Sequence, residues 1–331
     1  MLTIKEIAEM AKVSRSTVSR VLNDSGYVSE EARRRVLAVI EETGYMPSQH
    51  AKALRTKKTK VIGVILPKIS TETSGRVVNG INEVLQDQGY QILLTATNLD
   101  YQKEIEYLRL LKSRQVDGII LIATTVNAEL VAEIHQLNKP FVAIGQDIPK
   151  ASSVTFDDYH AAKEMTNYLI RKGYKNIAFI GVDESDPAVG IHRKQGFMSA
   201  MQDAKLTIHK EWMGQANFTI PSGFEAMKRI IRNSPENLRP DAVFAVTDRI
   251  AVGAMQYLKK AGFTVPQEMA VAGIGAADIS KYIDPALTTI DFENERAGRE
   301  AAVILLEKIE SHKEQQKKVV LNYRVIEGDS V

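Results

Sequence analysis

The sequence contains no cysteine among its 331 residues, which excludes disulfide bonds and thiolate metal sites and fits a reducing compartment. It also lacks any apolar run near the roughly 20 residues that span a bilayer. The first residues carry Lys5, Glu6 and Glu9 where a signal peptide requires an apolar stretch. We therefore expect a cytoplasmic protein with no membrane-bound part.

The sequence signatures of common enzyme classes are missing as well. No P-loop, His-Glu-x-x-His or Gly-x-Ser-x-Gly string occurs, and the six histidines are scattered without metal-ligand spacing. The segment 273–278 follows an apolar stretch but lacks the third small residue of a dinucleotide-binding loop. We predict no catalytic residue, no metal site and no cofactor.

Charge is distributed unevenly along the chain. Residues 1–60 hold 12 basic and 7 acidic residues, a net charge of +5, whereas the remaining residues have a net charge of −3. Hydrophobic content of 44% and charged content of 25% are ordinary for a globular protein. A basic first segment favours binding to a polyanion, although it can equally be a solvated surface.

Residues 3–23 show the pattern of two short helices joined by a tight turn. Thr3 and Glu6 match a capping box, Leu2 and Ile7 match a hydrophobic staple, and Ser14 can cap the second helix. The apolar residues expected to face inward are Ile7, Ala8, Ala11, Val13, Val18, Val21 and Leu22. Short polar side chains and two arginines then remain outward, which predicts a DNA-binding helix-turn-helix. The alternative is a plain amphipathic helical hairpin.

A third helix is expected to follow and to complete a headpiece over residues 1–46. Ser29 can cap its start, and Gly44 can end it after Thr43. Residues 47–59 have short side chains and several lysines, which predicts a hinge helix and linker that folds only on DNA.

From residue 61 onward, short apolar stretches alternate with segments of helical spacing. The predicted strands cover residues 61–66, 92–96, 118–122, 141–144, 177–180, 242–246, 270–274, 287–290 and 319–326. Such alternation predicts parallel sheets covered by helices on both faces, and the length favours two sheets. Ligands of these folds bind beyond the carboxyl ends of the strands.

The order of several segments resembles the lac/galactose repressor (LacI/GalR) family of bacterial transcriptional regulators. The resemblance rests on the helix-turn-helix, the linker around 48–56 and the segments 193–197, 241–245, 247–254 and 285–290, and it covers essentially the whole chain. It implies an N-terminal all-α headpiece plus an α/β periplasmic-binding-protein-like core of two parallel-sheet subdomains. Three crossing segments would join an N-subdomain, about 60–158 and 293–320, to a C-subdomain, about 159–292 and 321–331.

Carried over residue by residue, the resemblance assigns base contacts to Arg15, Ser16 and Arg20, and phosphate contacts to Ser14 and Thr17. Leu54 matches a leucine that family members insert into the minor groove, where it kinks the duplex, and Lys52 and Arg55 flank it. The alternative for Leu54 is an ordinary linker residue packed on the core.

The resemblance also implies a sugar-sized cleft between the subdomains. The effector-binding candidates are Thr73, Ser74, Thr124, Gln146, Arg193, Phe218, Asp248 and Phe292. These residue types suit a polyhydroxylated ligand, because Arg and Asp each satisfy two hydroxyls and an aromatic ring covers the apolar side of a sugar. The alternatives are a surface ion pair for Arg193 and Asp248 and a core aromatic for Phe218.

Two positions depart from the lac repressor pattern. Gly145 and Gly275 stand where that pattern places ligand-binding aspartates, so hydroxyl recognition must be redistributed. Together with the segment 67–76, these two glycines most resemble the pattern of the sucrose-operon repressor branch, and the pattern of trehalose-type repressors is the next most similar. Lys68 and Arg76 leave room for a phosphorylated sugar, with a solvated lysine as the alternative.

The implied function is repression of a sugar-utilisation operon. A homodimer would bind a palindromic double-stranded operator, and a small sugar or sugar phosphate would control its affinity. No leucine-heptad tail follows the last predicted strand, which favours a dimer over a tetramer. A transport-type sugar-binding protein would share the core but would have no reason to carry the first 56 residues.

Overall fold

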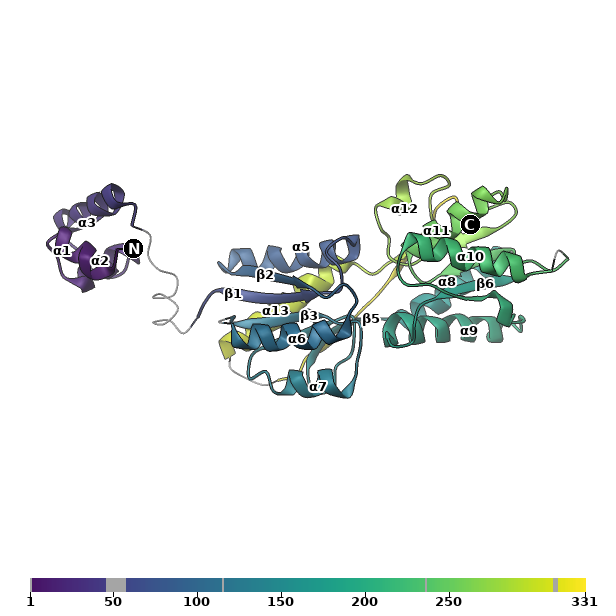
Figure 1. Cartoon of the computed structure of the whole chain (residues 1–331), viewed down its shortest axis with the longest axis horizontal. Coiled ribbons are helices and arrows are strands. Elements are labelled where there is room, and N and C mark those ends of the chain that lie inside the picture. Colours follow the sequence, from purple (N-terminus) through teal and green to yellow (C-terminus); the bar gives the residue numbers. More distant parts are fainter. Residues whose placement is uncertain (1, 46–57, 115, 236, 312–314) are drawn as a thin grey trace. The chain divides into compact units, whose positions relative to one another are not determined.

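The computed structural model describes residues 2–45, 58–114, 116–235, 237–311 and 315–331. The chain forms two compact units, Met1–Lys60 and Val61–Val331 (Figure 1).

The first unit is a three-helix headpiece. It consists of α1 (Ile4–Met10), α2 (Arg15–Leu22) and α3 (Glu30–Thr43). The predicted capping box is confirmed, because the Thr3 amide donates to Glu6 and the Glu6 amide donates to Thr3 Oγ1. Ser14 and Ser29 cap the next two helices as predicted, and α3 ends at Gly44. The buried apolar residues of this unit are Ile7, Ala8, Ala11, Val18, Val21, Val36 and Tyr45.

The second unit contains two subdomains, and the first is built on a parallel sheet of order β11-β5-β4-β3-β1-β2. The strands are β1 (Val61–Leu66), β2 (Gln91–Ala96), β3 (Gly118–Ile122), β4 (Phe141–Ile144), β5 (Ser152–Phe156) and β11 (Lys318–Leu321). Side chains alternate along these strands, so they form two cores. Helices α5 (Glu72–Asp87) and α13 (Asn294–Ser311) pack on one face, and α6 (Tyr101–Ser113) and α7 (Ala128–His135) pack on the other.

The second subdomain is built on a parallel sheet of order β7-β6-β8-β9. Its strands are β6 (Ile177–Gly181), β7 (Met213–Gln215), β8 (Ala242–Ala245) and β9 (Ala270–Ala272). The paired helices are α8 (Asp158–Arg171) with α9 (Arg193–Asp203), and α10 (Ile220–Asn233) with α11 (Asp248–Lys260), packed on the two faces (Figure 1). A π-helix (Pro187–His192) precedes α9, η2 (Lys210–Trp212) is a 3-10 turn, and α12 (Ile279–Tyr282) is short. Strands β10 (Thr289–Asp291) and β12 (Arg324–Ile326) form an antiparallel pair.

The predicted last strand, 319–326, is wrong as a single element. Its first half is β11, which pairs with β5 in the first subdomain, and its second half is β12, which pairs with β10 in the second. The apolar pattern is continuous across the break, so it could not show that the chain crosses between subdomains. Strands β5 and β7 were not predicted, because β5 begins with two serines and β7 has only three residues.

A close helix crossing fixes α5 in the first subdomain. A Cβ atom built on Gly80 would lie 1.9 Å from the Glu295 carbonyl oxygen of α13. A Cβ atom on Gly298 would lie 2.1 Å from the Val77 carbonyl oxygen of α5. The two backbones therefore touch, and this contact holds the N-terminal end of α5 at the site described below.

No helix in the described part of the chain has the length and apolar character needed to cross a membrane.

Candidate functional site

The candidate site is a cavity of about 210 Å³ between the two subdomains. Segments that follow the carboxyl ends of strands from both sheets line it, as expected for an open α/β fold. All eight residues predicted from the sequence lie in its wall, which brings together side chains up to 219 positions apart. They are Thr73, Ser74, Thr124 and Gln146 from the first subdomain, and Arg193, Phe218, Asp248 and Phe292 from the second.

Arg193 is the buried cation of the cavity. Its Nε donates to Asp158 Oδ1 at 2.6 Å, its Nη1 donates to the Val246 carbonyl, and its guanidinium lies over the Phe292 ring. The predicted alternative of a surface ion pair is wrong, because the side chains of Arg193 and Asp158 are 8% and 2% exposed. Nη2 makes no hydrogen bond with the described residues, so its N–H groups are donors left for a ligand.

Asp186 is a cavity residue that the sequence analysis missed. It caps the π-helix, with Oδ1 accepting from the Val189 amide at 3.1 Å, and the same oxygen accepts from Gln146 Nε2 at 2.7 Å. Burial raises the pKa of this carboxyl to about 6, against the lowering effect of those two hydrogen bonds. Gln146 belongs to the first subdomain, so this bond joins the two subdomains inside the cavity wall.

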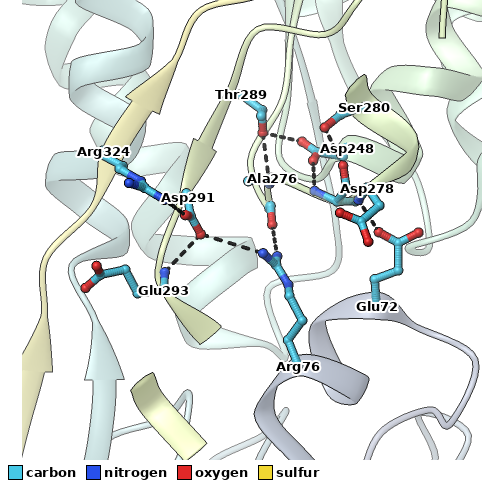
Figure 2. Close-up of polar contacts among 12 residues, drawn as sticks. Glu72, Arg76, Asp248, Ala276, Asp278, Ser280, Thr289, Asp291, Glu293 and Arg324 are labelled. Atoms are coloured by element: carbon cyan, nitrogen blue, oxygen red, sulfur yellow. Dashed lines mark hydrogen bonds and ion pairs between the residues drawn. The ribbon is translucent and has the colours of Figure 1, made fainter. Parts of the chain in front are cut away.

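Asp248 lies at the first turn of α11 and is also buried. Its Oδ1 accepts from the Thr289 hydroxyl (Figure 2), and its Oδ2 accepts from the Ala277 amide at 2.7 Å. Burial raises the pKa of Asp248 to about 6. Gly275 lines the cavity without a side chain, and a Cβ atom built there would lie 3.5 Å from Asp248 Oδ2, so the Asp248 carboxylate lies beside this position.

Two further side chains of α5 reach across to the second subdomain (Figure 2). The Asp278 amide donates to Glu72 Oε2, and Arg76 Nη2 donates to the Gly275 carbonyl. Arg76 Nη1 also lies 3.8 Å from Asp291 Oδ1. Arg76 is therefore occupied in holding the subdomains together and is not part of the cavity lining, whereas Lys68 does line the cavity.

Aromatic rings cover one part of the wall. Phe292 packs against Phe156 with ring centroids 5.0 Å apart, and Phe218 is half-buried with a φ of +65°. Phe292 is held on both sides, by Phe156 and by the Arg193 guanidinium. Phe218 packs partly against the hydrophobic core of the second subdomain and also lines the cavity.

Asp158 and Asp186, two cavity residues that were not predicted from the sequence, are held in the cavity wall by tertiary contacts. Asp158 is the first residue of α8 and Asp186 precedes a proline, which are ordinary helix-start and turn positions in the sequence. Arg249, which directly follows Asp248, also lines the cavity and is not among the predicted residues. Gln146 was predicted because it follows the carboxyl end of a strand, where ligands of these folds bind. Asp158 follows β5, which was not predicted, and Asp186 lies further beyond the end of β6, so the same position could have indicated both.

The headpiece presents the predicted DNA-contacting side chains on α2. Ser14 Oγ accepts from the Thr17 amide at 3.1 Å and lies within hydrogen-bond distance of the Ser16 and Thr17 hydroxyls. Arg15, Ser16 and Arg20 are exposed. The linker residues Lys52, Leu54 and Arg55, with most of the predicted hinge at 47–59, lie outside the described residues.

Metal chemistry has no candidate in the part of the chain that the structure describes. No group of three or more His, Cys, Asp or Glu side chains is arranged to hold an ion there.

Comparison with known proteins agrees with this architecture. Residues 3–48 match the family model of bacterial regulatory proteins of the lacI family, and residues 59–326 match the model of periplasmic binding proteins and the sugar binding domain of the LacI family.

Full-length relatives are similar along the whole chain. The transcriptional repressor PurR of Aliivibrio fischeri is 31% identical over 334 residues, covering 100% of this chain and 98% of the relative. The transcriptional regulator RegA of Clostridium saccharobutylicum is 32% identical, covering 99% and 98%. A solved complex of the transcriptional regulator CelR with cellobiose is 25% identical with a TM-score of 0.76 and full coverage of both chains.

These relatives are PurR, RegA and CelR proteins, so the sucrose-operon branch stays a prediction. The headpiece, the two-subdomain core and both family matches lead to one conclusion: the chain belongs to the LacI family of bacterial DNA-binding transcriptional regulators.

Proposed function

We propose that this protein represses a sugar-utilisation operon by binding a palindromic operator as a homodimer, under the control of a small sugar in the cavity. The observation that carries the proposal is the meeting of eight dispersed, sugar-compatible side chains in one cavity. The cavity volume is below the roughly 300 Å³ at which pockets for drug-sized ligands begin, which favours a monosaccharide-sized ligand such as fructose. The CelR complex with cellobiose supports a carbohydrate as the ligand class. A sugar phosphate or a trehalose-type effector is the alternative within the same family.

The first experiment identifies the ligand by thermal shift of the full chain. The panel contains fructose, sucrose, trehalose, ribose, their available phosphates and planar nucleobases, since a nucleobase can also stack on Phe218. We expect a small sugar to raise the unfolding temperature. Stabilisation by nucleobases alone would overturn the assignment to sugar.

The second experiment tests the site with Arg193→Ala. Loss of the Nη2 donor should weaken the sugar's effect on operator binding by roughly tenfold or more, while operator affinity without sugar is retained. Because this change leaves Asp158 buried without its cation, the double variant Arg193→Met, Asp158→Leu is measured beside it.

Lys194→Ala is the matched control for that experiment. Lys194 is the next residue on α9, and it pairs on the surface with Glu184 at 2.7 Å. It should leave the sugar response unchanged. A normal sugar response in both Arg193 variants would show that the effector binds elsewhere.

The DNA side is tested with inverted-repeat duplexes selected from a random library. Given the basic headpiece, the logarithm of operator affinity should fall steeply with the logarithm of salt concentration between about 50 and 200 mM. On the family resemblance, Leu54→Ala should weaken operator binding and leave sugar affinity intact. Unchanged operator affinity in that variant would remove the minor-groove insertion from the proposal.

The edge of the first sheet supports the homodimer. Among the described strands, β2 has a neighbour on one side only, and it exposes Leu93 and Leu94 at 41% and 43%. An exposed apolar edge strand is a surface that proteins usually cover. We expect Leu94→Glu to shift the mass measured by light scattering from dimer toward monomer, whereas a dimeric Leu94→Glu variant would exclude this edge.

A further inference from the structure

Glu104 is a buried carboxyl beside the cavity. It lies on α6 in the first subdomain, 1% exposed, and reaches the segment that follows β3. Its Oε1 accepts from the Thr124 amide at 3.2 Å and from the Thr124 hydroxyl at 2.8 Å, and its Oε2 accepts from the Thr125 hydroxyl at 3.1 Å. Within the described residues it makes no ion pair, so its charge is offset by neutral donors alone.

This contact determines what Thr124 can offer to a ligand. A hydroxyl has one proton, and the Thr124 hydroxyl donates that proton to Glu104. Thr124 lines the cavity, so its oxygen can only accept a further hydrogen bond there. The same holds if Glu104 is protonated on Oε2, because Oε1 already accepts from the Thr124 amide.

A second acceptor faces the same cavity. Asp186 lies near enough for its charge to add to the effect of burial, which is the main cause that raises the pKa of Glu104. Gln146 Nε2 occupies Asp186 Oδ1, and Oδ2 remains as an acceptor. This part of the wall therefore offers oxygen lone pairs and lacks a donor proton from Thr124.

We propose that Glu104 is a positioning residue that fixes Thr124 as a hydrogen-bond acceptor, so that the ligand must bring a hydroxyl proton to this wall. An ionised phosphate or a keto oxygen, which only accepts, is excluded from this position. The inference rests on the proposed function and refines it, because it states which chemical group of the sugar contacts Thr124.

The test compares parent sugars with analogues that cannot donate. The probes are D-fructose, D-glucose and D-ribose with their monodeoxyfluoro derivatives, bound to the full chain and measured by calorimetry. In the wild type, one derivative should bind roughly tenfold more weakly than its parent, because fluorine has no proton for Thr124.

Two substitutions of Glu104 separate positioning from packing. Glu104→Gln should keep the tenfold ratio, because the amide oxygen can accept both Thr124 protons and the amide nitrogen can donate to Thr125. Glu104→Ala frees the Thr124 hydroxyl proton. The affinities of the parent sugar and its fluoro derivative should then differ by no more than about twofold. Thr125→Val is the matched control: it removes a partner of the same carboxyl outside the cavity lining, and should keep the ratio.

Equal weakening of the parent and of every derivative in Glu104→Ala would overturn the proposal and leave Glu104 a structural residue. Loss of the ratio in Glu104→Gln would overturn it as well.

A ligand-free measurement keeps this inference separate from the proposed function. The Thr124 amide resonance in the full chain should follow the titration of Glu104 in the wild type and in Asp186→Asn, which removes the neighbouring titrating carboxyl, and should stay constant in the double variant Glu104→Gln, Asp186→Asn. If no sugar binds but the resonance titrates, the proposed function fails and the contact stands. A wild-type resonance that ignores pH overturns the contact itself.

Discussion

Asp186 and Asp248 place two carboxyls in the cavity wall without an ion-pair partner among the described residues. Burial raises the pKa of each to about 6, whereas the same groups titrate near 3.8 when exposed. Between those values the folded chain binds more protons than the unfolded chain. The stability that each group contributes is therefore fully present below about pH 4 and is lost as the pH rises to about 6.

Replacing Asp186 with Asn should remove the decrease in unfolding free energy that this carboxyl causes as the pH rises. Asn keeps an acceptor for the Val189 amide and Gln146 but never ionises. Relative to the wild type, Asp186→Asn should gain on the order of 2 kcal/mol of unfolding free energy between pH 4.5 and pH 7.5. Urea unfolding of both proteins across that pH range measures the difference.

Asp183→Asn is the control for this pH effect. Asp183 is exposed, and hydrogen bonds from Ser185 lower the pKa of its carboxyl. Its Asn variant should show no gain above pH 6. A constant difference between Asp186→Asn and the wild type at every pH would mean that Asp186 titrates normally.

At the scale of elements, the sequence was most informative where local chemistry decides the structure. The capping box at Thr3, the caps at Ser14 and Ser29, and the stop at Gly44 were all readable from residue type and spacing. The apolar runs of the central strands were equally clear. The π-helix and strand β7 were not, because short elements of this kind depend on their neighbours in the fold.

The cavity shows the same division. Residue type and position after a strand were enough to select Arg193 and Gln146 as candidates. They could not reveal that Asp158 pairs with Arg193 or that Asp186 pairs with Gln146, since each pair joins segments 35 to 40 positions apart. The sequence suggested that Arg76 could accommodate a phosphorylated sugar. In the structure, Arg76 instead contacts Gly275 and Asp291 of the second subdomain.

The contact of α5 with α13 should tolerate no side chain at its centre. A methyl group at Gly298 would lie 2.1 Å from the Val77 carbonyl oxygen, a backbone atom that cannot move aside cheaply. Gly298→Ala should lower the unfolding free energy by about 3 kcal/mol or more. Differential scanning calorimetry of the full chain measures it.

Gly75→Ala on the same helix α5 is the matched comparison. Nothing lies within 4 Å of a Cβ atom built there, so the alanine should be neutral or stabilise by up to about 1 kcal/mol. Similar stability losses in both variants would show that the helix crossing is not the cause.

At the scale of the two-subdomain core, polar contacts from three side chains of the first subdomain hold the subdomains closed around the cavity. They join Gln146 to Asp186, Glu72 to the Asp278 amide, and Arg76 to Gly275 and Asp291. All three lie at or beside the cavity, so ligand binding and closure act on the same groups. A ligand that prefers the closed form gains affinity in proportion to the population of that form.

Removing Arg76 should shift this balance toward the open form. Its contacts are partly exposed, so we expect Arg76→Ala to change the closed-to-open ratio by about 1 kcal/mol, roughly fivefold. The absence of native cysteine allows clean spin labelling at Gln86→Cys on α5 and Gln202→Cys on α9, both exposed. The distance distribution between the labels should broaden toward longer values in Arg76→Ala.

Arg324→Ala separates closure from simple loss of charge. Arg324 donates to the same Asp291 carboxylate at 2.8 Å, but both residues belong to the second subdomain (Figure 2). Its removal should leave the label distances unchanged, because no bond between subdomains is lost. If Arg324→Ala broadens the distribution as much as Arg76→Ala, the charge on Asp291 controls the geometry and the contact across the cleft does not.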